Sequence, residues 1–218
     1  MLELQNLTYA PATAESAVLT DICFEARSGQ PVLISGASGS GKTSLLDMIS
    51  GLSRERSGRV LWNGEPVSPR QRRWITGMVF QFPERHFLGL TVAQELRLGL
   101  RRLSTEAQEH VLQRVGLVGL DRSTPPERLS GGQQRRLAIA VQLLRGANVL
   151  LLDEPTAGLD WSVRDEVLQL LDELSREQVL IVVTHEPDLF KTWNCQRHQL
   201  LNGQLIPMTT LPSAEREI

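Results

Sequence analysis

The chain has 218 residues, a formal net charge of -2 and 22% charged residues, which is ordinary usage for one globular α/β domain with a sizeable core. This balance argues against a nucleic-acid-binding surface, so no nucleic-acid partner is expected. Two cysteines, Cys23 and Cys195, are too few for a disulfide framework. No apolar run reaches the roughly 18 to 20 residues that cross a bilayer, so any membrane role is expected to come through a partner.

The first 64 residues predict an antiparallel patch. Short strands are expected over residues 2–9 and 18–27, and residues 59–62 followed by Asn63-Gly64 predict a hairpin. Between them, the apolar run 31–35 enters a glycine-rich loop, and residues 43–50 have helical periodicity. This order predicts a strand, a loop and a helix in succession.

Three further strands are almost wholly aliphatic: residues 78–80, 149–152 and 179–183. Such strands are typical of a parallel sheet that is covered on both faces. Their polar residues follow at the carboxyl ends, where parallel α/β sheets bind ligands. The predicted fold class is α/β, with a mostly parallel P-loop core.

Residues 84–146 have a mainly helical pattern and predict a helical subdomain inserted into this core. Helices are expected over 92–103, 106–115 and 133–144, with a break at 124–126. Residues after Gly203 carry two prolines and end in charged residues, so a loose terminus is expected there. The predicted division is a domain over 1–206 and a tail over 207–218.

The glycine-rich loop fits the P-loop pattern and lies between the predicted strand and helix. Its glycines let backbone N–H groups surround phosphate, and its lysine adds a mobile charge for the β- and γ-phosphates, while Thr43 is expected on Mg²⁺. The expected nucleotide contacts are Gly36, Ala37, Ser38, Gly39, Ser40, Gly41, Lys42, Thr43 and Ser44. A glycine-rich surface loop without a ligand is the alternative interpretation.

The strand over 149–152 delivers two adjacent carboxylates. Asp153 is expected to hold the water shell of Mg²⁺, and Glu154, which points in a different direction, is expected to act as general base on the attacking water. An acidic turn at the end of a strand, with no chemistry, is the alternative.

Residues 129–133 read Leu-Ser-Gly-Gly-Gln and open the predicted helix that follows, with Ser130 as a candidate N-cap. With the P-loop and the two carboxylates, this motif makes the sequence resemble the ABC ATPase family from end to end. The resemblance implies an ABC ATPase fold with an N-terminal antiparallel β-subdomain. It also implies a head-to-tail dimer, of identical or different subunits, in which Ser130, Gly131, Gly132 and Gln133 contact the γ-phosphate of ATP on the partner. We expect uncapped N–H groups at this helix end to bind that anion.

The resemblance assigns further roles. Tyr9 would stack on adenine, Gln81 would reach Mg²⁺ and the attacking water, and His185 would contact the γ-phosphate. Asp160 lies in the turn after the two carboxylates. Catalysis is thus expected from Lys42, Gln81, Glu154 and His185, and Mg²⁺ ligation from Thr43, Gln81 and Asp153. Taken singly, a residue such as Tyr9 is more often a half-buried strand aromatic and one such as His185 more often structural, but the joint order and spacing of the motifs favour the assigned roles.

The segment Phe82-Pro83-Glu84-Arg85-His86-Phe87 follows Gln81 and looks like the pattern of energy-coupling factor ATPases, which drive uptake of vitamins or metal ions. This resemblance implies an integral membrane partner that contacts the segment from Phe82 to Leu88, and a peripheral location on the cytoplasmic face of the membrane. Many such ATPases carry a further C-terminal dimerisation region beyond the strand predicted near residues 199–203, so the expectation for this sequence is a minimal member that pairs through ATP and its membrane partner. A soluble ABC ATPase in assembly, of the Fe-S scaffold type, is the alternative.

Overall fold

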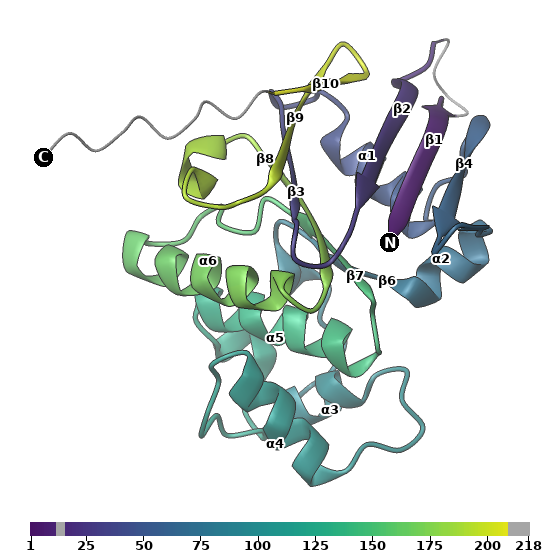
Figure 1. The fold of residues 1–218 in the computed structure, drawn as a ribbon. Helices are drawn as coiled ribbons and strands as arrows, with labels where there is room; N and C mark the ends of the chain where they lie inside the picture. Colours follow the sequence, from purple (N-terminus) through teal and green to yellow (C-terminus); the bar gives the residue numbers. More distant parts are fainter. Residues whose placement is uncertain (12–15, 209–218) are drawn as a thin grey trace, which may run out of the picture.

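Helix α1 (Lys42–Ser50) lies between two β-sheets in the computed structural model, which describes residues 1–11 and 16–208 (Figure 1). One sheet is antiparallel and four-stranded, in the order β2 (Leu19–Ala26), β1 (Leu2–Tyr9), β4 (Ser57–Trp62) and β5 (Glu65–Pro66). It forms the predicted β-subdomain.

The second sheet has six strands and forms the core. Its order is β10 (Gln204–Pro207), β9 (Gln196–Leu201), β3 (Val32–Ser35), β8 (Val179–Thr184), β7 (Val149–Asp153) and β6 (Thr76–Val79). Neighbouring strands run parallel except at β10, which pairs antiparallel with β9. The predicted mostly parallel sheet is confirmed.

Alternate residues of the central strands enter two separate cores. Val149, Leu151 and their neighbours on β3 and β8 pack with α1 and the antiparallel sheet, whereas Leu150 and Leu152 face the helices on the other side. Every residue of β3, β7 and β8 is buried because both faces are covered. The sheet therefore holds the carboxyl ends of these strands, where the polar residues begin, in fixed register.

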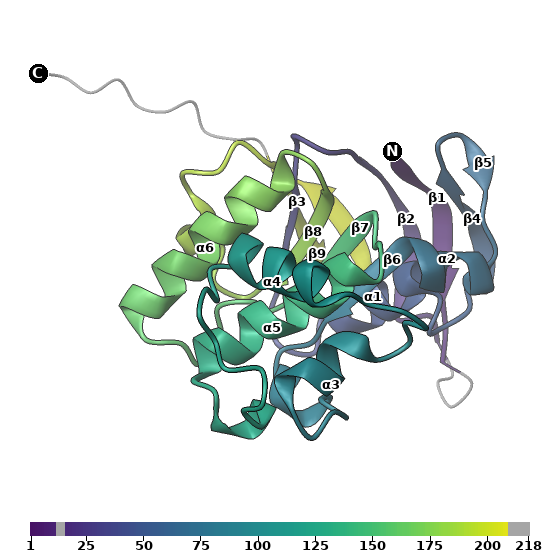
Figure 2. The same cartoon turned by 90° about the horizontal axis from the view of Figure 1, so that it is seen from below.

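The remaining helices lie mostly between β6 and β7 in the chain. They are α3 (Val92–Arg97), α4 (Thr105–Arg114) and α5 (Gly131–Leu144), while α2 (Pro69–Ile75) precedes β6 and α6 (Trp161–Ser175) follows β7. Short 3-10 turns span Pro83–Arg85, Pro126–Arg128 and Pro187–Phe190. Figure 2 shows α3, α4, α5 and α6 gathered on one side of the core sheet.

Two expectations about element ends were wrong. The helix expected over 92–103 ends at Arg97, because the chain leaves the helical conformation at Leu98 and Gly99 adopts a left-handed φ of 80°. Residues after Gly203 do not begin a loose terminus: β10 pairs with β9, and Pro207 is tolerated there because the strand lies at the sheet edge. The remainder of the expected tail, 209–218, lies outside the described residues.

Candidate nucleotide-binding and hydrolysis site

The predicted phosphate-binding loop connects the end of β3 to the start of α1. Gly41 caps α1 in a left-handed conformation, φ 100°, and supplies no side chain to the helix end. The first N–H groups of α1 therefore remain open toward a ligand. Lys42 is 7% exposed, and its Nζ donates to the carbonyl oxygens of Gly36 at 2.8 Å and Ala37 at 3.0 Å. The loop is thus folded around its own lysine.

Asp153 ends β7 directly opposite the first turn of α1. Its Oδ2 accepts a hydrogen bond of 2.8 Å from the Thr43 hydroxyl, which ties the two predicted Mg²⁺ ligands together. Burial raises the pKa of Asp153 above its ordinary value, the neighbouring Glu154 carboxylate adds to this, and the Thr43 hydrogen bond and Lys42 oppose it. A divalent cation would favour the charged carboxylate in this environment.

Glu154 occupies a left-handed backbone conformation, φ 47°, that non-glycine residues rarely adopt. Its Oε2 accepts from the His185 backbone N–H at 3.1 Å and lies 2.9 Å from His185 Nδ1. Its Oε1 lies 3.7 Å from Lys42 Nζ. The unusual backbone turn thus places the carboxylate between a lysine and a histidine, both predicted to act on phosphate.

These groups line one pocket of about 460 Å³. Its lining residues are Val18, Ser38, Gly39, Gly41, Lys42, Thr43, Ser44, Gln81, Asp153, Glu154 and His185. Apart from Val18, the lining residues come from four segments that are distant in sequence, and these meet here because the parallel strands that precede them end at the same sheet edge. Val18 was not predicted: a lone aliphatic residue before a strand gives no sequence signal for a pocket wall.

The donor set fits Mg²⁺. Thr43 offers a hydroxyl, Asp153 a carboxylate and Gln81 an amide oxygen in the same pocket, and this oxygen chemistry suits a hard cation that keeps part of its water shell. Among the described residues there is no cluster of three or more His, Cys, Asp or Glu side chains that would hold a metal by protein ligands alone. A P-loop magnesium site, shared with nucleotide phosphates, is compatible with both observations.

Other predicted residues lie outside this pocket. Tyr9 is half-buried on β1, and its hydroxyl donates to Ser53 Oγ at 3.4 Å. Asp160 occupies the N-cap position of α6, but its side chain forms no capping hydrogen bond with that helix. Residues 130–133 are also absent from the pocket lining. The adenine role of Tyr9 and the γ-phosphate role of the signature therefore stay predictions.

Ser130 is the N-cap of α5, as predicted, so the expectation of a fully uncapped set of N–H groups at this helix end was wrong in part. Ser130 Oγ accepts from Gln133 N–H at 3.3 Å, and the Gln133 side chain accepts from Ser130 N–H at 2.9 Å, which forms a capping box. These bonds occupy the N–H groups of Ser130 and Gln133. The N–H groups that a ligand could still take at the first turn are those of Gly131 and Gly132.

Gly132 also allows α5 to approach α6 closely. A Cβ placed on Gly132 would lie 2.1 Å from Cγ1 of Val163, which is shorter than real contacts permit. A Cβ on Gly131 would lie 3.3 Å from Leu159. The signature turn is therefore packed on the turn that contains Asp160 and on the first turn of α6.

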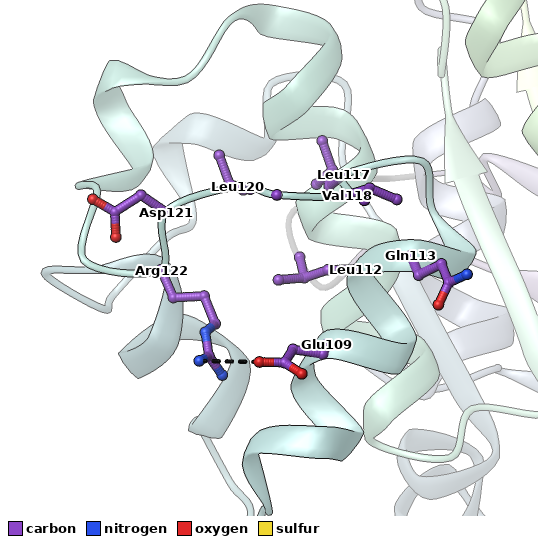
Figure 3. A pocket seen from close by; sticks show the side chains of 9 residues that line it. Glu109, Leu112, Gln113, Leu117, Val118, Leu120, Asp121 and Arg122 are labelled. Atoms are coloured by element: carbon purple, nitrogen blue, oxygen red, sulfur yellow. Dashed lines mark ion pairs between the residues drawn. The ribbon is translucent and has the colours of Figure 1, made fainter.

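A separate cavity of about 480 Å³ lies in the helical region (Figure 3). An ion pair between Arg122 and Glu109, 3.4 Å apart, spans one side of it, and Val118 on its rim is 77% exposed. It contains none of the predicted catalytic or nucleotide-binding residues.

No helix within residues 1–11 and 16–208 has the length and apolar character needed to span a bilayer.

Comparison with known proteins agrees with this geometry. The ABC transporter family model matches residues 19–157. A chloroplastic ABC transporter I family member 11 from Arabidopsis thaliana is 38% identical over 204 residues, covering 85% of this chain and 72% of that protein. An energy-coupling factor transporter ATP-binding protein, EcfA2, from Methanospirillum hungatei is 34% identical over 222 residues, covering 96% of this chain. The present chain spans 55% of the length of that relative.

Among solved structures, a dimeric ATP-binding cassette in a post-hydrolysis state with ADP and phosphate superimposes with a TM-score of 0.80 at 26% identity. The match covers 97% of this chain and 99% of that one. The predicted ABC ATPase fold is thereby confirmed. The family match, the relatives and the P-loop site lead to one conclusion: the chain belongs to the ABC transporter family and is an ATP-binding subunit that hydrolyses ATP.

Proposed function

We propose that this ATPase powers an energy-coupling factor-like transporter that takes up a vitamin or a metal ion, through an integral membrane partner bound beside residues 82–88. The main support comes from two consecutive residues that line two different pockets. Gln81 lines the nucleotide pocket, whereas Phe80 lines a neighbouring groove. A partner in that groove would press on the segment that reaches the nucleotide.

The groove has a volume of about 480 Å³ and a largely apolar wall. It is lined by Met78, Val79, Phe80, Pro83, His86, Phe87, Leu88, Glu95, Leu98, Gly99, Ala138, Val141, Gln142 and Arg145. Leu88 is 81% exposed and Phe82, just outside, is 40% exposed. Exposed aliphatic and aromatic side chains around an apolar groove are typical of a site that receives a partner's helix or loop.

The loop that forms the rim is fixed before any partner arrives. The carboxylate of Glu95, itself only 5% exposed, accepts from the N–H groups of Leu88 at 2.8 Å and Gly89 at 2.7 Å. Charge-assisted bonds to consecutive N–H groups hold the loop in one conformation. Preorganisation of this kind lowers the entropy cost of binding.

The chemistry proposed for the nucleotide pocket follows from its geometry. Lys42 and the open N–H groups of α1 bind the phosphates, and Glu154 accepts the proton of the attacking water, with His185 on the γ-phosphate. Thr43, Gln81 and Asp153 would hold Mg²⁺, which neutralises the charge that develops on the transferred phosphoryl group. Tyr9 would stack on the adenine.

Each pocket is proposed to be completed by a second ATPase subunit, identical or not. Residues 130–133 and Asp160 lie outside their own chain's pocket, so they are free to serve a neighbour's. Two glycine N–H groups at the start of α5, with the positive end of the helix dipole, suit the γ-phosphate of that neighbour. The dimeric form of the related cassette structure supports this arrangement. The complex would lie at the cytoplasmic face of the membrane.

The test is photo-crosslinking in the protein's own cells. A photo-reactive residue is placed at Leu88 in the tagged Glu154→Gln protein, and the matched control carries it at Val118, which is 77% exposed but lines the other cavity. We expect an integral membrane protein to be crosslinked at Leu88 and not at Val118. Crosslinking of soluble proteins alone at Leu88 would overturn the transport proposal and favour an assembly ATPase.

A further inference from the structure

The guanidinium of Arg135 lies at the junction of three segments of the hydrolysis site, although the sequence places it only inside the helix that follows the signature. Arg135 is 3% exposed. Its Nη1 donates to the carbonyl oxygen of Glu154 at 3.2 Å and to that of Phe80 at 3.4 Å, and its Nη2 donates to the carbonyl oxygen of Ala157 at 3.1 Å. One side chain thus links α5, the end of β6 and the turn after β7.

Burying an arginine is costly unless its donors are used. Among the ion pairs of the described residues none involves Arg135, and its Nε has no partner there. Burial lowers the pKa of Arg135 from its ordinary value, and the carboxylates of Glu84 and Asp153 oppose this shift. A salt bridge therefore does not account for the burial of Arg135. Its donors are directed instead to backbone carbonyl oxygens of the hydrolysis site.

The most informative of these carbonyls is that of Glu154. A left-handed conformation costs an L-residue about 1–2 kcal/mol, so the surrounding structure must hold it. Glu154 N–H donates to Val183 O at 2.9 Å, and Glu154 O accepts from Ala157 N–H at 3.1 Å as well as from Arg135. The peptide on each side of Glu154 is therefore held by hydrogen bonds, and Arg135 provides one of the two bonds to the C-terminal one.

We propose that Arg135 is a positioning residue that holds Glu154 in its left-handed turn and links that turn to the peptide before Gln81. Because the same guanidinium binds Phe80 O, a displacement of the groove segment is transmitted directly to the Glu154 backbone. This inference rests on the proposed role of Glu154 as general base. It predicts loss of turnover with nucleotide affinity retained.

The experiment compares Arg135→Met and Arg135→Lys with a matched buried arginine, Arg72→Met. Arg72 is 0% exposed, pairs with Glu55 and does not line the nucleotide pocket. Methionine keeps much of the side-chain length and the helix propensity of arginine. We measure kcat, the KM for ATP, the Kd for ATP and Tm for each variant.

For Arg135→Met we expect kcat to fall at least about 30-fold while the Kd for ATP stays within about 3-fold, as for an interaction that acts on the chemical step. Arg135→Lys should recover part of kcat. Arg72→Met should lower Tm without this loss of kcat. Folded Arg135→Met with kcat within about 3-fold of the unmodified protein would overturn the proposal. If Arg135→Met does not fold, Arg135→Gln, which also lacks the guanidinium group, is judged by the same criterion.

A double-mutant comparison separates this inference from the role of Glu154. If Arg135 acts through Glu154, adding Arg135→Met to Glu154→Gln should lower the residual single-turnover rate no further. Additive losses would overturn the positioning role. An active Glu154→Gln protein would instead contradict the base assignment, whatever Arg135 does.

Discussion

The P-loop and the signature turn are both glycine-rich starts of helices, yet their helix ends are completed differently. Helix α1 begins after Gly41 with no side-chain cap, inside a pocket that already contains carboxylates, a lysine and a histidine. Helix α5 begins with a capping box from Ser130 and Gln133 and lies outside that pocket. One helix end lies inside a pocket with the other predicted catalytic groups, and the other lies outside it, where the proposed role is to bind the γ-phosphate of ATP on a second chain.

The two helix ends differ in how many backbone N–H groups they leave without a partner. An uncapped N-terminus leaves several N–H groups for phosphate, whereas a capped one keeps the helix stable in the absence of ligand. The two glycines that remain at α5 offer fewer donors but allow close packing on α6. Three predictions test this contrast, in order of decreasing expected effect, and a fourth, with the smallest effect, concerns the edge of the core sheet.

Glu154→Gln should lower kcat by about 10²- to 10⁴-fold, because the amide cannot accept the proton of the attacking water. The Kd for ATP should change little, since Lys42 and the loop are intact. In the presence of ATP the protein should elute as a dimer in size-exclusion chromatography. A variant that hydrolyses ATP at the normal rate and stays monomeric would contradict both the base assignment and the paired site.

Lys42→Ala should raise the Kd for ATP about 10- to 100-fold, since a charged hydrogen-bond donor to phosphate contributes about 1.5–3 kcal/mol. Isothermal titration calorimetry measures this directly. The contrast with the signature is tested by mixing Lys42→Ala with a signature variant, Ser130→Arg. Each is expected to be inactive alone, and an equal mixture should recover about a quarter of the activity if two chains share each site. Failure of every mixture to recover activity would argue against shared sites.

Gly132→Ala should lower kcat about 10-fold and destabilise the fold by about 1–3 kcal/mol, because the new Cβ overlaps Val163 and displaces the start of α5. Val163→Ala removes Cγ1, and the next atom, Cβ, lies 3.6 Å from the position of the added carbon, which is an ordinary contact. The double variant should therefore regain Tm and kcat. No rescue would mean that close packing on α6 is not what requires this glycine.

The smallest expected effect concerns the edge of the core sheet, away from both helix ends. Burial lowers the pKa of His198, whose ring packs on Phe24 and whose two nitrogens have no partner among the described residues. Since its folded pKa lies below the unfolded value, its contribution to stability is present above the unfolded pKa and is lost as the pH falls through the folded one. His198→Phe should flatten the decline of Tm from pH 7 to pH 5, whereas exposed His110→Gln should leave it unchanged. Equal slopes in all three proteins would contradict this account.

Local sequence pattern was enough to predict the central strands and most of the nucleotide pocket. Aliphatic runs placed the strands β3, β7 and β8, and glycine, lysine and carboxylate spacing identified the pocket residues. These signals are reliable because strand burial and phosphate binding each restrict the residue types that fit. The family resemblance added Gln81 and His185, which single-residue patterns could not assign.

Contacts between distant residues became evident only in the folded chain. The sequence carries no sign that Arg135 reaches the Glu154 turn, that Val18 forms a pocket wall, or that Val163 requires a glycine at residue 132. Sequence pattern also misplaced the end of α3 and missed β10, since both depend on partners elsewhere in the fold. Local pattern reports the burial, helix and turn preferences of each segment. Packing between segments depends on residues that are distant in sequence and become neighbours only when the chain folds.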